Sequence, residues 1–177
     1  IQTLSAGDLG LGEPDETAET FEGNARIKSH AAARASGLPA LADDSGLEID
    51  GIGGQPGVRT ADWADTGGGQ AGRDYMAGMR RAWEMLEAAQ APEPRTARFV
   101  CVLSLAWPDG HDETVRGTVE GRVVWPPRGG RGFGYDPMFV ADGHAITFGE
   151  MEPDAKHAIS HRADAFAKLV AACLEGR

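Results

Sequence analysis

Acidic side chains gather in the segment LADDSGLEID, residues 41–50, where they lie among apolar residues. Neighbouring carboxylates repel each other, and neither gains from burial unless a cation or hydrogen-bond donors offset the cost. Together with Glu16, the pair Asp43 and Asp44 offers the hard oxygen ligands that suit Mg²⁺, which usually takes one or two protein carboxylates together with substrate phosphates. A carboxylate left over could accept a proton from water. The alternative is that Asp43 forms an Asx turn and Asp44 is solvated.

A second candidate is the glycine-rich stretch GGRGFGYDP, residues 129–137, which places Phe133 and Tyr135 among glycines. A ring exposed by such a loop can stack on a nucleobase, a contact worth ~1–3 kcal/mol, and glycines let backbone N–H groups approach a phosphate or a base edge. The spacing fits neither a dinucleotide fingerprint nor a P-loop. The alternative function for this stretch is a hydrophobic plug between strands.

The third candidate is KHAISHR, residues 156–162. His157 and His161 have the spacing of a zinc pair, but the intervening AIS lacks the glutamate of a zinc-protease helix, so this interpretation is disfavoured. A better interpretation makes Ser160 an N-cap and places His161 and Arg162 in the first helical turn, where backbone N–H groups and a cation face an electron-rich ligand. Arginine donates and never accepts, so it would favour a carbonyl oxygen over an amino group on a base.

The composition limits the class of protein. A chain of 177 residues is long enough for one domain with a substantial core, which we assign to residues 1–177. Its net charge of −10 disfavours nonspecific binding to nucleic acid or to an anionic membrane. No apolar run approaches the ~20 residues of a membrane span, and no signal segment opens the chain. Cys101 and Cys173 lie in apolar segments, which predicts reduced thiols and a cytoplasmic location.

Helical and strand patterns alternate along the chain, which predicts one α/β or α+β domain built around a single sheet. The helices are expected at residues 17–36, 73–90 and 162–174, and the strands at 39–42, 47–50, 96–107, a partner strand through 119, and 121–125. The DDSG turn is expected to separate the first two strands. Spacings of three and four residues predict the buried faces of the last two helices as Met76, Met79, Trp83 and Leu86, and as Phe166, Leu169, Val170 and Cys173.

Four motifs, ETFEGNARIKS, LADDSGLEIDGIGGQPGV, GFGYDP and KHAISHR, occur in an order and spacing that resembles the inosine triphosphate pyrophosphatase family. The resemblance covers nearly the whole chain. It implies an α/β fold with an elongated central mixed sheet flanked by helices, and two lobes with the active site in the cleft between them. It also implies Mg²⁺-dependent hydrolysis of ITP, dITP and XTP to the monophosphate and pyrophosphate by a cytoplasmic homodimer.

The resemblance assigns roles to individual residues. Asp44 matches the family's general base and Mg²⁺ contact, Glu16 matches a metal ligand, and Asp43 is expected to support them as a further ligand. The remaining matches are to substrate-contacting positions: Lys28, Ser45, Lys156, the base-binding loop Phe133, Gly134, Tyr135 and Asp136, and the purine-reading pair His161 and Arg162.

Two departures from the family pattern stand out. Nothing in residues 1–15 supplies the family's phosphate-binding S-x-N-x-G-K loop, so we expect the sequence to lack an N-terminal strand, loop and helix. The family's S-A-R-Y is replaced by TADW at residues 60–63, which removes an arginine. Two alternatives stay open: a related house-cleaning pyrophosphatase that acts on other modified bases, and a nucleotide-binding module without turnover.

Overall fold

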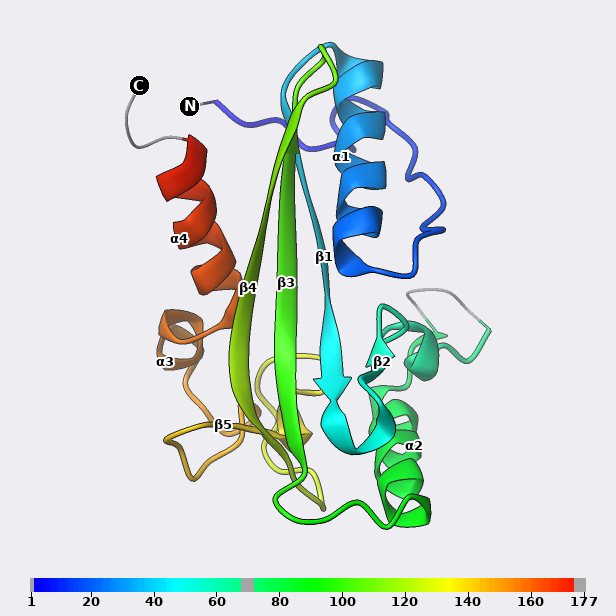
Figure 1. The fold of residues 1–177 in the computed structure, drawn as a ribbon, viewed down its shortest axis with the longest axis vertical. Coiled ribbons are helices and arrows are strands. Elements are labelled where there is room, and N and C mark those ends of the chain that lie inside the picture. The colour runs from blue at the N-terminus through cyan, green and yellow to red at the C-terminus, as the bar shows by residue number, and fades with distance from the viewer. Residues whose placement is uncertain (1, 68–71, 174–177) are drawn as a thin grey trace.

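The protein has an elongated sheet with helices on both of its faces (Figure 1). This computed structural model describes residues 2–67 and 72–173. The elements are α1 (Phe21–Ser36), β1 (Ala40–Ile49), η1 (Asp50–Ile52), β2 (Gln55–Gly57), η2 (Asp62–Ala64), α2 (Tyr75–Ala88), β3 (Thr96–Ala106), β4 (Asp112–Val123), η4 (Asp136–Met138), β5 (Phe139–Ala141), α3 (Pro153–Ala158) and α4 (His161–Cys173). The predicted α/β class is confirmed.

The strands follow the order β2-β1-β3-β4-β5, and each neighbouring pair is antiparallel. The family resemblance implied a mixed sheet, whereas all strand pairs among the described residues are antiparallel. Strands β3 and β4 form a hairpin, and a hairpin joins antiparallel strands. On its outer edge β1 pairs with β2 only from Leu47 to Ile49. Within the described ranges, residues 40–46 therefore have no strand partner on that edge.

The DDSG motif lies inside β1 and does not form a turn. Strand β1 pairs with β3 without interruption from Ala40, opposite Ala106, to Ile49, opposite Ala97. The prediction of two short strands here is wrong because cross-strand pairing over the whole length overrides the local turn preference of Asp, Ser and Gly. Likewise, the partner strand and the GRVVW strand are largely one strand, β4.

Helix α1 packs on β1 and β3 and begins later than predicted. Its N-cap is Thr20, whose side chain accepts a hydrogen bond from the N–H of Gly23 at 3.1 Å. It ends as predicted at Gly37, whose φ of 70° is left-handed. Its buried residues Phe21 and Ala25 form a cluster with valines of β3. This packing fixes α1 over the sheet and places Lys28 beside β1.

Helix α4 packs on β4 and β3 on the opposite face (Figure 1). A Cβ atom at Gly117 would lie 2.3 Å from the backbone N of Ala165 and the backbone O of His161, so only glycine allows this close approach. The predicted buried face is correct at Leu169 but wrong at Phe166, whose exposed fraction is 55%. Ala165 takes the place beside β4, because close contact at Gly117 leaves room only for a small side chain.

The largest core lies where α2, β5 and the lower ends of the long strands meet (Figure 1). The rings of Phe99, Phe139 and Phe148 pack there with centroids 4.7–6.0 Å apart. Helix α2 contributes Met79 and Leu86, as predicted, and Trp83 packs partly buried against them; Met76, predicted to be buried, is 46% exposed. This core supports the glycine-rich loop.

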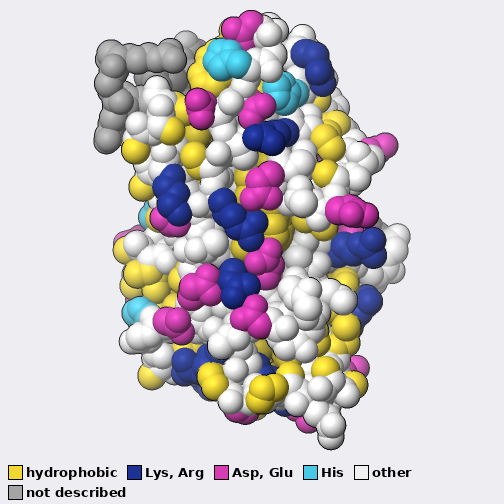
Figure 2. Space-filling view, in the orientation of Figure 1, with side chains coloured by type: hydrophobic (Ala, Val, Ile, Leu, Met, Phe, Trp, Pro, Cys, Tyr) yellow, Lys and Arg dark blue, Asp and Glu magenta, His cyan; other side chains and the backbone are white. Residues whose placement is uncertain are grey.

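Charged side chains cover part of the sheet on the face that carries α1. Figure 2 shows acidic and basic groups interleaved along the face that it views. Arg116 pairs with Glu22 and Glu48, and Arg98 pairs with Glu48 and Glu120. Because the signs alternate, each of these charges has an opposite partner.

Candidate active site

One group of candidate residues lies between β1 and α1. Successive residues of a strand point to opposite faces, and Asp44 points to the face covered by α1. Asn24 and Lys28 lie four residues apart on α1 and therefore share one side of the helix. The Nζ of Lys28 lies 2.7 Å from Oε1 of Glu16 and 3.5 Å from Oδ1 of Asp44. The structure thus brings Glu16 and Asp44, which the sequence grouped as candidate metal ligands, together with Lys28.

Asp44 is the most perturbed acid of this group. Its exposed fraction is 7%, and its buried Oδ2 has no hydrogen-bond partner among the described residues. Burial raises the pKa of Asp44 to about 6; the charge of Lys28 opposes this shift, the charge of Glu16 adds to it, and hydrogen bonding from Asn24 opposes it. A carboxylate with a pKa close to neutral is suited to accept a proton from water.

Lys28 keeps its charge in this setting. Burial lowers its pKa, but the hydrogen bond to Glu16 and the negative charge of Asp44 outweigh burial, so the net pKa is raised. A permanent cation between two carboxylates is placed to compensate negative charge on a bound phosphate.

The same two carboxylates fit a magnesium ion. Glu16 and Asp44 converge on one cationic centre, and the unpaired Oδ2 of Asp44 is a ready ligand atom. Mg²⁺ usually takes one or two protein carboxylates and completes its shell with phosphate and water. In the described ranges no cluster of three or more histidine, cysteine or acidic residues could hold a metal ion. A site with only two protein ligands would therefore depend on the substrate for further ligands.

Asp43 lies on the other face of β1 and does not join this group. Its Oδ2 lies 3.3 Å from Nη2 of Arg162 and accepts a hydrogen bond from Oγ of Ser45 at 3.1 Å. The prediction that Asp43 supports Asp44 as a ligand of the same ion does not match this arrangement, because adjacent strand residues point in opposite directions. Ser45, predicted to contact substrate, also lies on this second face.

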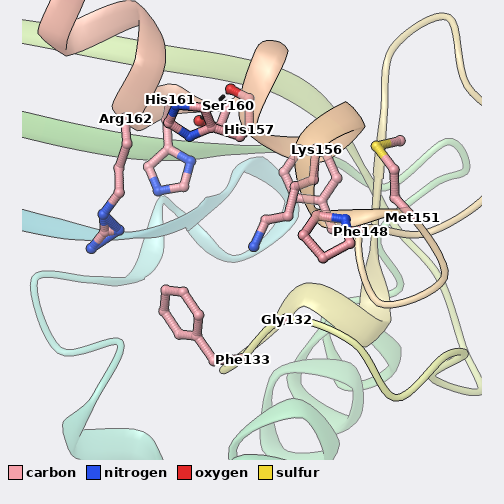
Figure 3. Close-up of a pocket in the computed structure, with 10 residues that line it drawn as sticks. Gly132, Phe133, Phe148, Met151, Lys156, His157, Ser160, His161 and Arg162 are labelled. Atoms are coloured by element: carbon pink, nitrogen blue, oxygen red, sulfur yellow. Dashed lines mark hydrogen bonds between the residues drawn. The ribbon is translucent and has the colours of Figure 1, made fainter.

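A second group of candidate residues forms a pocket between the glycine-rich loop and α3 and α4 (Figure 3). The side chain of Phe133 is 65% exposed, and its ring lies across the pocket from Lys156, His161 and Arg162. The Nζ of Lys156 lies 5.0 Å from the ring centroid, and Cζ of Arg162 lies 5.7 Å from it. An exposed ring flanked by two cations can stack on a flat, electron-rich ligand.

Asp136 positions the loop from beneath. It is buried, and its Oδ2 accepts a hydrogen bond from the N–H of Phe133 at 2.8 Å and pairs with Nζ of Lys156. Gly132 has a φ of 73°, and a Cβ there would lie 2.1 Å from the same oxygen. Asp136, predicted to contact the base, therefore fixes the backbone of Phe133 and the ammonium of Lys156.

Tyr135 does not face the pocket. Its ring is buried in the main core and meets Tyr75 edge to face, with centroids 5.9 Å apart. The prediction that this ring stacks on a base is wrong in this structure, because the loop turns between its two aromatic residues. Gly134 stands at that turn with a φ of 64°, a conformation that favours glycine. Phe133 is therefore the stacking residue of the loop.

The start of α4 forms the opposite wall of the pocket. Ser160 is the N-cap as predicted, because its Oγ accepts a hydrogen bond from the N–H of Ala163 at 3.1 Å. The ring of His161 is buried and stacks on Phe99, with centroids 5.1 Å apart. Burial, together with the positive charges of Arg162 and Lys156, lowers the pKa of His161 to about 3. The imidazole is therefore neutral at physiological pH, and its buried Nδ1 has no partner within the described ranges.

In each of the two groups, sequence reasoning missed residues that contribute to the site. Asn24 is buried, its Oδ1 accepts a hydrogen bond from the N–H of Ala18 at 2.9 Å, and its side chain lowers the pKa of Asp44. Its spacing of four from Lys28 was the available signal. Phe148 and Met151 line the pocket, but they arrive from a segment with no regular pattern, so no signal pointed to them.

The two groups meet through β1, because Asp43 contacts Arg162 and its neighbour Asp44 contacts Lys28. One group suits a phosphate chain with a cation, and the other suits a flat, polar ring. Together, the two groups indicate a nucleotide-binding protein.

Comparison with known proteins gives the family. The model of the Ham1 family matches residues 1–172, and the chain belongs to that family. It is 57% identical over 176 residues to a dITP/XTP pyrophosphatase of Ruegeria pomeroyi, covering 99% of this chain and 85% of that protein. It is 58% identical over 181 residues to a dITP/XTP pyrophosphatase of Agrobacterium fabrum, covering 97% and 84%.

Solved structures agree with this assignment. A HAM1 protein from Coxiella burnetii superposes with a TM-score of 0.87 and 37% sequence identity, covering 96% of this chain and 84% of that one. A nucleoside-triphosphatase, also described as dITP/XTP pyrophosphatase, from Mycobacterium abscessus has a TM-score of 0.75 and 37% identity, covering 94% and 85%. None of the described helices combines the length and apolar character needed to cross a bilayer.

Proposed function

We propose that this protein hydrolyses non-standard purine nucleoside triphosphates, namely dITP, ITP and XTP, to the monophosphate and pyrophosphate. The observation that carries the proposal is the buried Asp44, whose pKa is raised to about 6, beside Lys28 and Glu16. Relatives more than 50% identical over nearly the whole chain are named dITP/XTP pyrophosphatases, which supports the same reaction here.

Asp44 acts on the attacking water. Its carboxylate accepts a proton from, or orients, a water molecule that attacks the α-phosphorus in line with the leaving pyrophosphate. Phosphoryl chemistry depends on positioning and charge compensation more than on a covalent nucleophile. Lys28 supplies a permanent positive charge for the phosphate oxygens.

Magnesium is part of the proposal. Glu16 and Asp44 would hold the ion, and a bound Mg²⁺ supplies charge neutralisation for the phosphate oxygens. The hydrogen bond that Oδ1 of Asn24 accepts from the N–H of Ala18 ties down the segment that precedes α1 and includes Glu16. Dependence on Mg²⁺ is tested by the loss of turnover in EDTA and its return on addition of the metal.

The base pocket selects the purine. The ring of Phe133 stacks on the base, and Arg162 with the backbone N–H groups at the start of α4 donates to the 6-oxo oxygen of hypoxanthine or xanthine. The 6-amino group of adenine would meet these donors with donors of its own. Each polar group left unpaired costs ~1–3 kcal/mol, which favours the oxo purines.

The direct test is pyrophosphate release from dITP and dATP at equal concentration with Mg²⁺. We expect rapid release from dITP and much slower release from dATP. Equal turnover would refute the base selectivity, and turnover of other modified nucleotides in preference to dITP would favour a related house-cleaning enzyme. Binding of inosine nucleotides without any release would identify a binding module.

The location and assembly of the protein are separate proposals. We propose a cytoplasmic location, on the apolar setting of the two cysteines, and a homodimer, on the family resemblance. Light scattering coupled to size exclusion tests the dimer, and a mass of about 18.6 kDa, that of one chain, would contradict it.

A further inference from the structure

Asp43 stands apart from the acids that are proposed to serve the phosphates. It lies opposite Leu103 of β3, on the sheet face where α4 packs against β3 and β4. Its side chain is half-exposed and contacts Arg162 and Ser45. Its link to the base pocket is Arg162, which lines that pocket.

Arg162 occupies a position that is electrostatically unfavourable for a cation. It is the second residue of α4, and the first turn of a helix carries partial positive charge. The ammonium of Lys156 lines the same pocket and adds a second positive charge there. Oδ2 of Asp43 supplies a counter-charge to the guanidinium at 3.3 Å.

Each of the two cations that line the pocket is thus paired with an acid. Asp136 pairs with Lys156, and Asp43 pairs with Arg162. The hydrogen bond from Oγ of Ser45 at 3.1 Å fixes the same oxygen of Asp43 that faces Arg162. Asp43 is therefore restrained on the strand side, as a positioning residue must be.

We propose that Asp43 is a positioning residue for Arg162 and that it sets the discrimination between 6-oxo and 6-amino purines. Of the two adjacent aspartates, only Asp44 serves the phosphates. The inference rests on the proposed function and adds a specificity determinant to it. A base contact depends on the direction of the guanidinium, since donation is directional. Loss of Asp43 lets Arg162 move away from Lys156 into solvent.

The experiment compares Asp43→Asn with wild type on dITP and dATP. We expect KM for dITP to rise by up to about fivefold, the range set by a half-exposed ion pair. The preference for dITP over dATP falls by a similar factor, while kcat and the Mg²⁺ concentration for half-maximal activity do not change. Asp43→Glu restores most of the preference, because it keeps the charge. Asp109→Asn, which removes an acid exposed at the β3–β4 hairpin, is the matched control and has no effect.

Two further measurements separate this inference from its alternatives. In an Arg162→Ala background, Asp43→Asn has no additional effect, because the partner is already gone. Calorimetric affinities for IMP and AMP give the base preference without turnover. They therefore test Asp43 even if wild type releases no pyrophosphate from dITP, a result that would refute the proposed function alone.

A fall in kcat with a higher Mg²⁺ requirement would overturn the inference in favour of a metal ligand. If Asp43→Asn leaves the preference for IMP over AMP unchanged, the Asp43–Arg162 pair is only a surface contact and the inference is refuted.

Discussion

Replacing Asp44 with asparagine should abolish turnover and, at the same time, stabilise the protein at neutral pH. The pKa of Asp44 is raised to about 6, whereas an unfolded aspartate has a pKa of ~3.9. The fold therefore prefers the protonated form. The stabilising contribution of this group is fully present below about pH 4 and is lost as the pH rises through 6, which costs about 3 kcal/mol at pH 8.

Asparagine is neutral and nearly isosteric with the protonated acid, so it avoids this loss. Lys28 gives up one partner in the variant but keeps Glu16, which limits the offsetting penalty. We therefore expect Asp44→Asn to gain up to about 3 kcal/mol in the free energy of unfolding at pH 8, and about half of that at pH 5.

The assay is urea unfolding of both proteins in EDTA at pH 5 and pH 8, with Asp142→Asn, which removes an exposed acid, as a control for the loss of one negative charge. EDTA removes divalent metal, so the comparison reports the side chain alone. Asp44→Asn could instead be less stable than wild type at pH 8, or the difference in unfolding free energy could be the same at both pH values. Either result would refute the claim that ionised Asp44 destabilises the fold.

Three further predictions address the pocket and the packing. Phe133→Ala should weaken the binding of IMP by ~1–3 kcal/mol in calorimetry, and an unchanged affinity would show that the loop is only structural. His161→Phe keeps the stack on Phe99 and removes a group whose pKa is lowered to about 3. Since that histidine stabilises the fold above about pH 6.5 and loses this contribution as the pH falls, wild type should lose about 2 kcal/mol relative to the variant between pH 8 and pH 5 in urea unfolding; parallel curves would contradict this. Gly117→Ala should destabilise the protein by roughly 1–3 kcal/mol, because its Cβ meets the α4 backbone at 2.3 Å; unaltered thermal unfolding would contradict the close packing.

The residue types of the site could be predicted from the sequence, and so could much of their grouping. The spacing in ETFEGNARIKS placed Lys28 on a helix, and the apolar pattern placed Asp44 near a strand, but neither pattern predicted that the two side chains meet. The cap at Ser160 followed from its hydroxyl next to the last helix.

The directions of side chains were harder to predict. Interpreting DDSG as a turn placed both aspartates on one side, whereas pairing with β3 made the segment extended and separated them. Similarly, the left-handed glycine between Phe133 and Tyr135 sends one ring outward and the other into the core, a choice that the sequence alone does not reveal. Both errors concern backbone geometry that is set by distant partners.

The most direct test of the proposed chemistry follows oxygen from water. When dITP is turned over in H₂¹⁸O with Mg²⁺, attack at the α-phosphorus places one ¹⁸O in dIMP and none in pyrophosphate, as mass spectrometry of the two products would show. Label in the pyrophosphate, or release of inorganic phosphate in its place, would contradict the account.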